Sequence, residues 1–538
     1  MAYSVPVPNY FPIIYVRGFA FSDSEIEETT DDPTNGFNIG TTHARQGFRE
    51  RPIRYRFPGP FVRLITNHGY EDAIRGYEDS PDGAADPRRT LWIHRFYEPY
   101  SDTFVETGKG SRPSIVEAAT GLQSLVEHVR KVCFKEDDTD KRVILIAHSM
   151  GGLVCRSFMQ QVLESPAGDV IEKVVTYGTP HGGIPLSSRW IQYHGISNFS
   201  PKDLFRSLAP KDVEEKDFDP QELRNFEPER FLCVIGTNDL DYDVGGGVVR
   251  ALAGAASDGL VPIDRAWVAK APRVYVYRSH SGRYGLVSSA EAWAAVERFL
   301  FGGLRATVRL GPNGDHHFGS HPPTDKDPDT RVVSLMDLEC TIGREEARVN
   351  DRRADHLSAL VLAATPDRDY VGAEDRAYTF YFQKTDLNTG AYGFAMSFRL
   401  RTDYYAKGKM RESDVLMMQH LSAWITKPEK RLVLNYQWLG GEMLQADLAD
   451  NACEIAFPSY SFGIEGVNDV TLRIELTEID EDGFTSETPT TATRSGGGSP
   501  TAAVPYEDVT VAEPNPFEWK PGEGRAELEH YPWEIEES

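Results

Sequence analysis

The sequence predicts an α/β fold with a mostly parallel sheet, followed by a β-sandwich-like domain and a disordered C-terminal tail. In the first part of the chain, short β-branched runs alternate with helical stretches, which is typical of βαβ units. About seven strand-like runs then follow one another without helices, as in a sandwich. The last part is rich in Thr, Ser, Gly and Pro, which supply little apolar surface for a core. The predicted divisions are residues 1–303, 304–480 and 481–538.

Hydrophobic periodicity predicts the elements of the first division. Apolar side chains recur at helical spacing over residues 114–134, which predicts an amphipathic helix, and residues 290–301 predict a closing helix. Residues 21–60 are polar and rich in Asp, Thr, Arg and Pro, so we expect an insertion or a long loop. The strands predicted for the parallel sheet lie at residues 10–20, 91–97, 143–147, 172–177, 230–235 and 273–277.

The second division is predicted to be all-β because several of its runs alternate apolar and polar residues. A fold of this kind does not by itself indicate a function. The predicted strands are 306–310, 331–341, 378–383, 392–401, 431–438, 453–457 and 470–479.

The stretch at residues 143–152, Val-Ile-Leu-Ile-Ala-His-Ser-Met-Gly-Gly, predicts a nucleophile. Ser149 follows an apolar run and lies between small residues, as in a strand-to-helix turn that exposes a serine hydroxyl. The usual pattern is G-x-S-x-G, and Ala147 replaces the first glycine with the smallest possible addition. The alternative is an ordinary buried strand followed by a Ser-capped helix over residues 153–163.

Chain order predicts the partners of Ser149. Hydrolases with such a turn carry an acid and then a histidine downstream of the serine. Asp258 and His280 fit this order, and each lies downstream of a predicted strand whose carboxyl end would present it. His280 would take the proton of Ser149, and Asp258 would orient the imidazole. Asp239 is the alternative acid, because it follows the strand predicted at residues 230–235.

Together these segments resemble serine esterases and lipases of the α/β-hydrolase superfamily. The order and spacing are similar to those of bacterial lipases and of the lipase-like group that includes GPI inositol-deacylase-type proteins. The resemblance covers about residues 10–302 and implies an α/β-hydrolase fold. It rests on residues 12–19 (Pro-Ile-Ile-Tyr-Val-Arg-Gly-Phe), 147–152 (Ala-His-Ser-Met-Gly-Gly), 177–183 (Tyr-Gly-Thr-Pro-His-Gly-Gly) and 257–262 (Ser-Asp-Gly-Leu-Val-Pro) with His280.

The resemblance also implies an oxyanion hole. Such lipases usually carry His-Gly after the first of these segments, whereas this chain has Arg17 and Gly18. The N–H of the residue after the glycine, here Phe19, would be one donor, and the N–H of Met150 would be the other. Both donors are backbone groups, so the departure at Arg17 need not disable them.

Residues 184–229 interrupt the strand–helix pattern. Apolar residues are interspersed there with Ser, Pro, Asn and charges, which is compatible with a lid over the site. Trp190, Ile191 and Phe205 would then line an acyl-binding pocket. A plain two-helix packing insertion is the alternative.

Other polar residues have simpler explanations. His148 is expected to pack beside the turn, and His181 to shape the loop after a strand. The acidic residues from Asp239 to Asp243 lack the glycine and final glutamate of an EF-hand loop. The polar cluster of Asp315, His316, His317 and His321 is interpreted as a solvated loop, so we expect no metal site.

Composition limits the partners. The net charge of −25 argues against nucleic acid and against unaided binding to anionic membranes. No apolar run approaches the roughly 20 residues of a membrane span. The N-terminus lacks the pattern of a secretory signal, so a cytoplasmic location is expected. The five cysteines are scattered and odd in number, which predicts no disulfide framework.

The sequence therefore predicts a serine carboxylic-ester hydrolase that needs no cofactor. The expected partner is a small-molecule or lipid ester; the resemblance and the apolar lid candidate favour acyl glycerides or phospholipids. An acyltransferase or a thioesterase could use the same residues. A catalytically silent hydrolase fold that acts as a binding or scaffold protein is the rival from another class. No pattern in the chain predicts a number of subunits.

Overall fold

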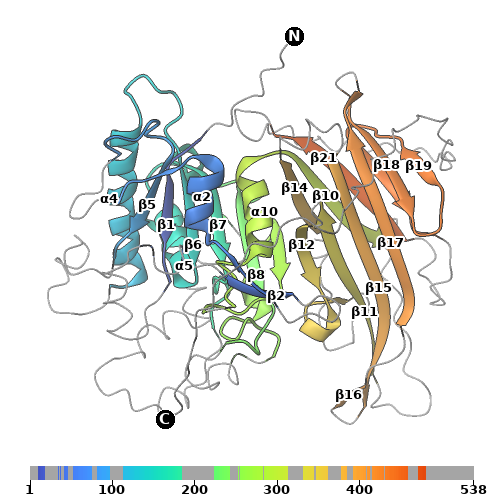
Figure 1. The fold of residues 1–538 in the computed structure, drawn as a ribbon. Coiled ribbons are helices and arrows are strands. Elements are labelled where there is room, and N and C mark those ends of the chain that lie inside the picture. The colour runs from blue at the N-terminus through green and yellow to red at the C-terminus, as the bar shows by residue number, and fades with distance from the viewer. Residues whose placement is uncertain are drawn as a thin grey trace, which may run out of the picture.

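The structure is a computed structural model, and Figure 1 shows its fold. It describes residues 10–18, 34, 37, 41–45, 53–74, 81–96, 113–184, 223–242, 253, 255–282, 284–312, 331–343, 347–361, 377–383, 392–406, 409–411, 415–428, 431–458 and 470–479. The tail predicted for residues 481–538 lies outside these residues.

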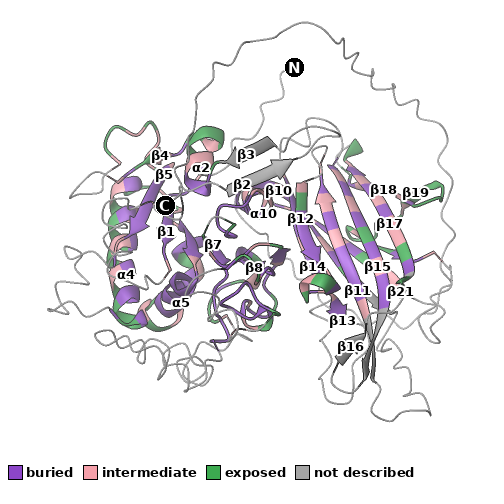
Figure 2. Cartoon of the chain, turned by 60° about the horizontal axis from the view of Figure 1, so that its bottom comes forward, coloured by how far each residue is buried: buried purple, intermediate pink, exposed green. Residues whose placement is uncertain are grey.

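A seven-stranded sheet forms the first domain, and every neighbouring pair in it is parallel. Apart from the edge strand β4, its strands are buried along nearly their whole length, as Figure 2 shows, because helices or other elements cover both faces. The predicted α/β-hydrolase fold is confirmed. In spatial order the strands are β4 (Glu71–Asp72), β5 (Thr90–His94), β1 (Ile13–Val16), β6 (Val143–His148), β7 (Ile171–Tyr177), β8 (Phe231–Gly236) and β9 (Arg273–Val276).

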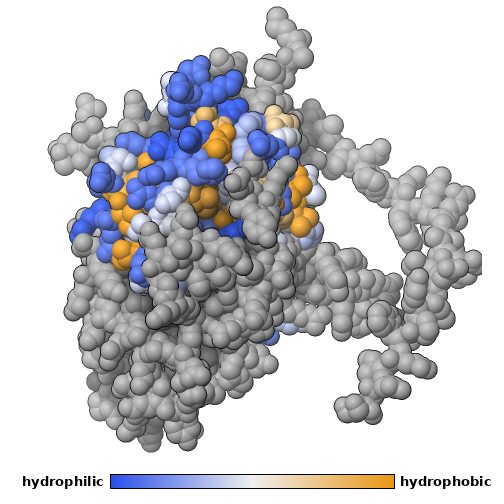
Figure 3. Space-filling view, turned by 90° about the vertical axis from the view of Figure 1, so that its left-hand side faces the viewer, coloured by the Kyte–Doolittle hydropathy of each residue, from blue (hydrophilic) through white to orange (hydrophobic). Residues whose placement is uncertain are grey.

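Helices flank this sheet. The helix predicted at residues 114–134 is α4 (Ile115–Cys133), and it begins in a capping box between Ser114 and Glu117. Its outer side presents hydrophilic residues among smaller hydrophobic areas on the face shown in Figure 3. The other helices are α2 (Pro60–His68), α5 (Met150–Ser157), a π-helical turn at Phe158–Val162, and α10 (Ala290–Phe301). Short 3₁₀ turns lie at Ala167–Asp169, Pro228–Arg230, Ile263–Arg265 and Ala354–His356.

The insertion or long loop predicted for residues 21–60 contains a pair of strands, which favours an insertion. Within it, β2 (Thr41–Arg45) and β3 (Ile53–Phe57) form an antiparallel pair. Their sequences, Thr-Thr-His-Ala-Arg and Ile-Arg-Tyr-Arg-Phe, hold few aliphatic residues, so the period-2 signal of a half-buried strand is weak.

Two antiparallel sheets form a separate second domain. Phe380 and Phe382 of one sheet pack against Phe394 of the other, with ring centroids 5.0 and 6.1 Å apart. The first sheet has the order β14 (Ala377–Gln383), β10 (Gly302–Pro312), β21 (Val470–Glu478), β20 (Ala452–Ala456). The second has the order β12 (Ala347–Arg352), β11 (Arg331–Ile342), β15 (Tyr392–Ala406), β17 (Val415–Thr426), β18 (Val433–Trp438), β19 (Met443–Ala446), with β13 (Leu360–Val361) on β11 and β16 (Lys409–Arg411) on β15.

Helix α10 joins the two domains. It lies between the parallel sheet and the sandwich (Figure 1), and β10 begins directly after it. Lys173 of β7 donates to the carbonyl oxygens of Phe299 and Leu300 at the C-terminal end of the helix, at 3.0 and 2.9 Å. On the other side, the Phe299 ring packs edge-on against Tyr381 of β14, 5.3 Å away. One helix end therefore ties both domains together.

The five cysteines of the chain are all described, and each is buried and free of disulfides. None of the helices in the described ranges has the length and apolar character that a membrane span requires.

Candidate active site

Ser149 occupies a strained turn between β6 and α5. Its φ of 53° and ψ of −127° are sparsely populated for a residue with a side chain, and its N–H donates to the Tyr177 carbonyl at 2.8 Å. A Cβ on Gly151 would lie 2.2 Å from the carbonyl oxygen of Val16, and one on Gly152 would lie 2.2 Å from Thr179 Oγ1. Only glycine allows β1 and the loop after β7 to approach this turn so closely.

The structure brings Ser149, His280 and Asp258 together. The Oγ of Ser149 lies 2.9 Å from His280 Nε2, and His280 Nδ1 lies 2.8 Å from Asp258 Oδ2. A carboxylate accepts, so Nδ1 carries the proton, and Nε2 is then free to accept from the serine hydroxyl. All three side chains are buried; even Ser149 is only 8% exposed. In such surroundings a hydrogen bond is electrostatically stronger than in water.

Asp258 is held in place by its own turn. Its Oδ1 accepts the N–H groups of Leu260 and Val261 at 3.0 and 2.7 Å, so both carboxylate oxygens have partners. The backbone carbonyl of Asp258 accepts the N–H of His280 at 2.8 Å, which adds a second link between the two residues. Asp258 and His280 are therefore fixed relative to each other through both side chain and backbone.

Gly178 is a site residue that the sequence reasoning left without a role. It has a φ of 53°, and a Cβ there would lie 2.8 Å from Asp258 Oδ2 and 3.0 Å from His280 Nδ1. The Tyr-Gly-Thr-Pro-His-Gly-Gly segment that contains it was noted as a match, but its closeness to Asp258 could not be read from one sequence.

His148 packs beside the turn, as expected, and also contacts His280. Its Nε2 lies 3.0 Å from the backbone oxygen of His280, and the two rings are 4.9 Å apart. Burial, and then the nearby His280, lower the pKa of His148 to about 3. The imidazole is therefore neutral near pH 7 and donates from Nε2. Tyr242 packs edge-on against the His280 ring, 5.8 Å away.

His181 and Asp239, the other histidine and acid considered from the sequence, are not part of the hydrogen-bonded series Ser149–His280–Asp258. His181 Nε2 lies 3.1 Å from Thr176 Oγ1, and burial lowers its pKa well below the ordinary value. Asp239 lies in the loop after β8, and the carboxylate bonded to His280 is that of Asp258. Within the described ranges, no three His, Cys, Asp or Glu side chains are grouped as metal ligands. Asp243, Asp315, His316, His317 and His321 lie outside those ranges.

Part of the expected oxyanion hole is described. Met150 is the first residue of α5 and is buried, so its N–H lies at the positive end of the helix beside Ser149. Gly18 approaches the same place, since a Cβ there would lie 3.0 Å from the Cβ of Ser149. Phe19, the other predicted donor, lies outside the described residues, as do the predicted pocket residues Trp190, Ile191 and Phe205.

Comparison with protein families connects this segment to a known group. Residues 113–204, which include Ser149, match the family model of the PGAP1-like alpha/beta domain. The predicted resemblance is confirmed over this segment. Among curated proteins, no match is found.

Solved structures give distant matches. One is the lin2722 gene product of Listeria innocua, at 13% identity and a TM-score of 0.25, covering 54% of this chain and 94% of that one. Another is phospholipase PlaB of Legionella pneumophila, at 13% identity and a TM-score of 0.31, covering 74% and 89%. A third is PlaB of Legionella pneumophila in complex with thio-NAD, at 13% identity and a TM-score of 0.32, covering 75% of this chain and 91% of that one. These scores carry no argument about the activity of this chain.

Proposed function

We propose that this chain is a serine carboxylic-ester hydrolase. The observation that carries the proposal is the hydrogen-bonded series Ser149–His280–Asp258, with its serine at a positive φ at the head of a helix. A structural serine gains nothing from such strain, whereas a nucleophile must be presented in this way.

In the proposed reaction, Ser149 Oγ forms a bond to the ester carbonyl carbon while its proton passes to His280 Nε2. The carbonyl oxygen becomes an oxyanion, which the N–H groups of Met150 and Phe19 would stabilise. The carbon–oxygen bond to the alcohol then breaks, and His280 returns the proton to the leaving alkoxide. Water, deprotonated by His280, then attacks the acyl carbon, the bond from that carbon to Ser149 Oγ breaks, and His280 returns the proton to Oγ as the acid leaves. Asp258 stabilises the imidazolium at both stages.

The chemistry is assigned to residues 1–303, because the three side chains all lie there. Residues 184–229 would cover the site as a lid, and Trp190, Ile191 and Phe205 would line the acyl pocket. A hydrophobic acyl ester, including an acyl glyceride or phospholipid, is the proposed substrate class. This preference rests on the sequence resemblance and on the apolar content of that segment.

The test combines two reagents on the full chain. A fluorophosphonate labels only an activated serine, and p-nitrophenyl acetate, butyrate, octanoate and palmitate report hydrolysis and acyl length. The expected result is labelling and hydrolysis in the wild type and neither in Ser149→Ala. Labelling without hydrolysis of any ester would favour a specialised acyl group or an acyltransferase. A folded wild type that does neither would contradict the proposal and favour the silent scaffold.

A further inference from the structure

The strand that leads to His280 borders the sandwich domain. β9 is the outermost strand of the parallel sheet, and the spatial neighbour on its open side is β12 of the sandwich. An edge strand usually leaves backbone groups unpaired, and covering it is one of the ways in which proteins satisfy them. Contacts between β9 and β12 therefore involve the segment that leads to His280, the proposed base.

Three side chains of the sandwich hold this segment. Asn350 Oδ1 accepts the N–H of Tyr275 at 3.3 Å, which satisfies a backbone donor of β9. The guanidinium of Arg352 lies over the Tyr275 ring, 4.2 Å from its centroid. Directly after β9, the ring of Tyr277 stacks on that of His356, with centroids 3.6 Å apart and planes 13° from parallel.

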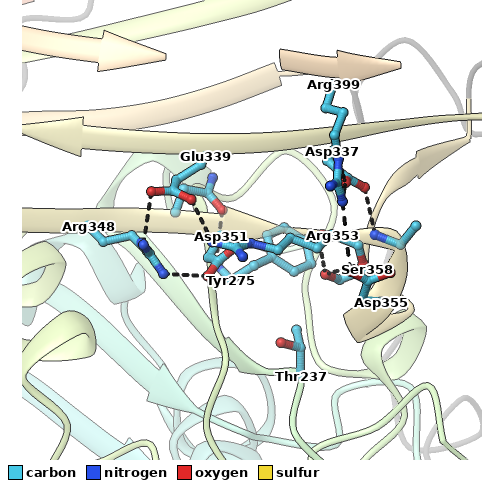
Figure 4. A network of polar contacts seen from close by, with 12 residues as sticks. Thr237, Tyr275, Asp337, Glu339, Arg348, Asp351, Arg353, Asp355, Ser358 and Arg399 are labelled. Carbon is cyan, nitrogen blue, oxygen red and sulfur yellow. Dashed lines mark hydrogen bonds and ion pairs between the residues drawn. The ribbon is translucent and has the colours of Figure 1, made fainter. Parts of the chain in front are cut away.

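The corner that carries His356 is itself rigid. The N–H of Ala354 donates to Asp337 Oδ1 at 2.7 Å, and the N–H of Arg353 donates to Ser358 Oγ at 2.9 Å. Arg399 donates through Nε to the other oxygen of Asp337 at 2.8 Å, which anchors the corner to β15. Figure 4 shows Asp337, Arg399 and Ser358 grouped at one end of this network. His356 is thus presented from a fixed support and not from a loose loop.

Tyr277 is coupled to His280 by a short, anchored connection. Only Arg278 and Ser279 lie between them. The Arg278 carbonyl accepts the N–H of Asn238 at 3.2 Å, and its guanidinium pairs with Glu291 of α10 at 2.9 Å. Ser279 exchanges backbone hydrogen bonds with the returning loop, donating to Tyr284 at 3.2 Å and accepting from Leu286 at 2.9 Å. Because these bonds fix the geometry of the two intervening residues, we expect a displacement of the Tyr277 backbone to be passed on to His280 and not to be absorbed by a loose connection.

The stack on His356 is needed to fix the Tyr277 side chain, because that side chain is not buried. The residue is 37% exposed and lines a cleft of about 460 Å³ between the domains. Without the His356 ring, Tyr277 could turn into that cleft. A general base must be held within about 0.5 Å and 10–20° of its productive geometry.

We infer that His356 is a positioning residue for His280, acting through Tyr277, so that the sandwich domain helps to align the active site. The inference rests on the proposed function. His356 touches neither substrate nor reacting atoms in this scheme; it fixes the direction of the segment that carries the base.

The experiment compares variants of the full chain in kcat, KM, the rate of fluorophosphonate labelling and the thermal midpoint. His356→Ala removes the stack, His356→Phe keeps a flat ring, and Tyr277→Ala removes the stack from the other side. His420→Ala is the matched control, since this histidine also lies in the sandwich and its Nδ1 lies 2.9 Å from Ser397 Oγ on the neighbouring strand.

We expect His356→Ala to lower kcat and the labelling rate by about tenfold, with KM within about twofold and a nearly unchanged thermal midpoint. His356→Phe should restore most of the rate, and His420→Ala should behave as wild type. Tyr277→Ala and the double variant should both match His356→Ala, because residues that act through one another are not additive.

Two outcomes overturn the inference alone: a reactive wild type with an equally reactive His356→Ala, or a double variant whose loss is the product of the single losses. If His356→Ala does not fold, Tyr277→Ala decides in the same way. A wild type that neither labels nor hydrolyses overturns the proposed function and this inference with it.

Discussion

The Nε2 of His148 lies 3.0 Å from the backbone carbonyl oxygen of His280. The residue just before the proposed nucleophile thus holds the backbone of the residue that would activate it. A carbonyl oxygen can only accept, and the low pKa of His148, about 3, keeps its imidazole neutral. The contact is therefore a fixed N–H donor and not a second titrating base.

Replacing His148 by Ala should lower kcat by about fivefold, because a buried hydrogen bond is worth about 1 kcal/mol and its loss leaves the carbonyl of His280 unsatisfied. His148→Gln is the matched variant, since its side-chain amide can still donate. It should retain most of the activity. Ester hydrolysis checks the effect, and equal losses in both variants would argue against a role for the donor.

Asp258→Asn should lower kcat by about 10³- to 10⁴-fold, because an amide can donate to Nδ1 and so favours the wrong tautomer of His280. The turn should survive, since the remaining oxygen can still accept the N–H groups of Leu260 and Val261. The matched control is Asp239→Asn, the other acid that the sequence allowed. Ester kinetics separate the two; a large loss in Asp239→Asn with little loss in Asp258→Asn would reverse the assignment.

The candidate site was accessible from sequence to the extent that its signals are local. Ser149 follows from a ten-residue stretch, and Asp258 and His280 follow from chain order together with the strands that precede them. The roles of Gly178 and His148 depend on contacts between loops far apart in the chain, 2.8 Å for a Cβ on Gly178 and 3.0 Å for His148. No periodicity or motif encodes such distances.

The fold shows the same division. Six of the seven strands of the parallel sheet are largely buried, so their apolar runs were visible and their predicted positions are confirmed to within a few residues; β4, two acidic residues, was not predicted. Strands β12, β17 and β19 were missed, as were the short strands β4, β13 and β16. The sequence of β12, Ala-Arg-Val-Asn-Asp-Arg, is mostly polar and resembles that of a loop. Its polar residues are nevertheless buried, which the sequence does not indicate. β17 begins Val-Leu-Met-Met-Gln-His, which breaks the alternation.

The free energy of unfolding provides a test of the backbone strain at Ser149. Ser149→Gly should unfold with about 1 kcal/mol more free energy than Ser149→Ala, because alanine keeps the strain of a positive φ and glycine does not. Both variants should be inactive. Urea unfolding gives the difference.

The matched pair for this comparison is Ser124→Gly and Ser124→Ala, at an exposed position inside α4. There the sign should reverse, with the glycine variant less stable by about 1 kcal/mol. If glycine is also the less stable variant at position 149, the turn stores no strain.

A buried histidine at the end of β5 should contribute to the pH dependence of stability. His94 donates to the Ala118 carbonyl at 2.7 Å, and burial lowers its pKa to about 4. Its unfolded value is about 6.5, so between pH 6.5 and pH 4 the unfolded chain binds a proton that the folded chain does not. The free energy of unfolding therefore falls as the pH is lowered through this window, by up to about 1.4 kcal/mol per pH unit from this group.

His94→Gln should remove this contribution while its amide can still donate to Ala118. Urea unfolding at several pH values should then show a shallower decline between pH 6.5 and pH 4 than in the wild type. Above pH 7 the imidazole of His94 is neutral in both the folded and the unfolded protein. A difference in the free energy of unfolding between variant and wild type there reports packing alone and serves as the internal control. His148 and His181, which burial also keeps neutral, remain in the variant and should leave a residual decline. Identical slopes in the two proteins would show that His94 does not titrate on unfolding in this range.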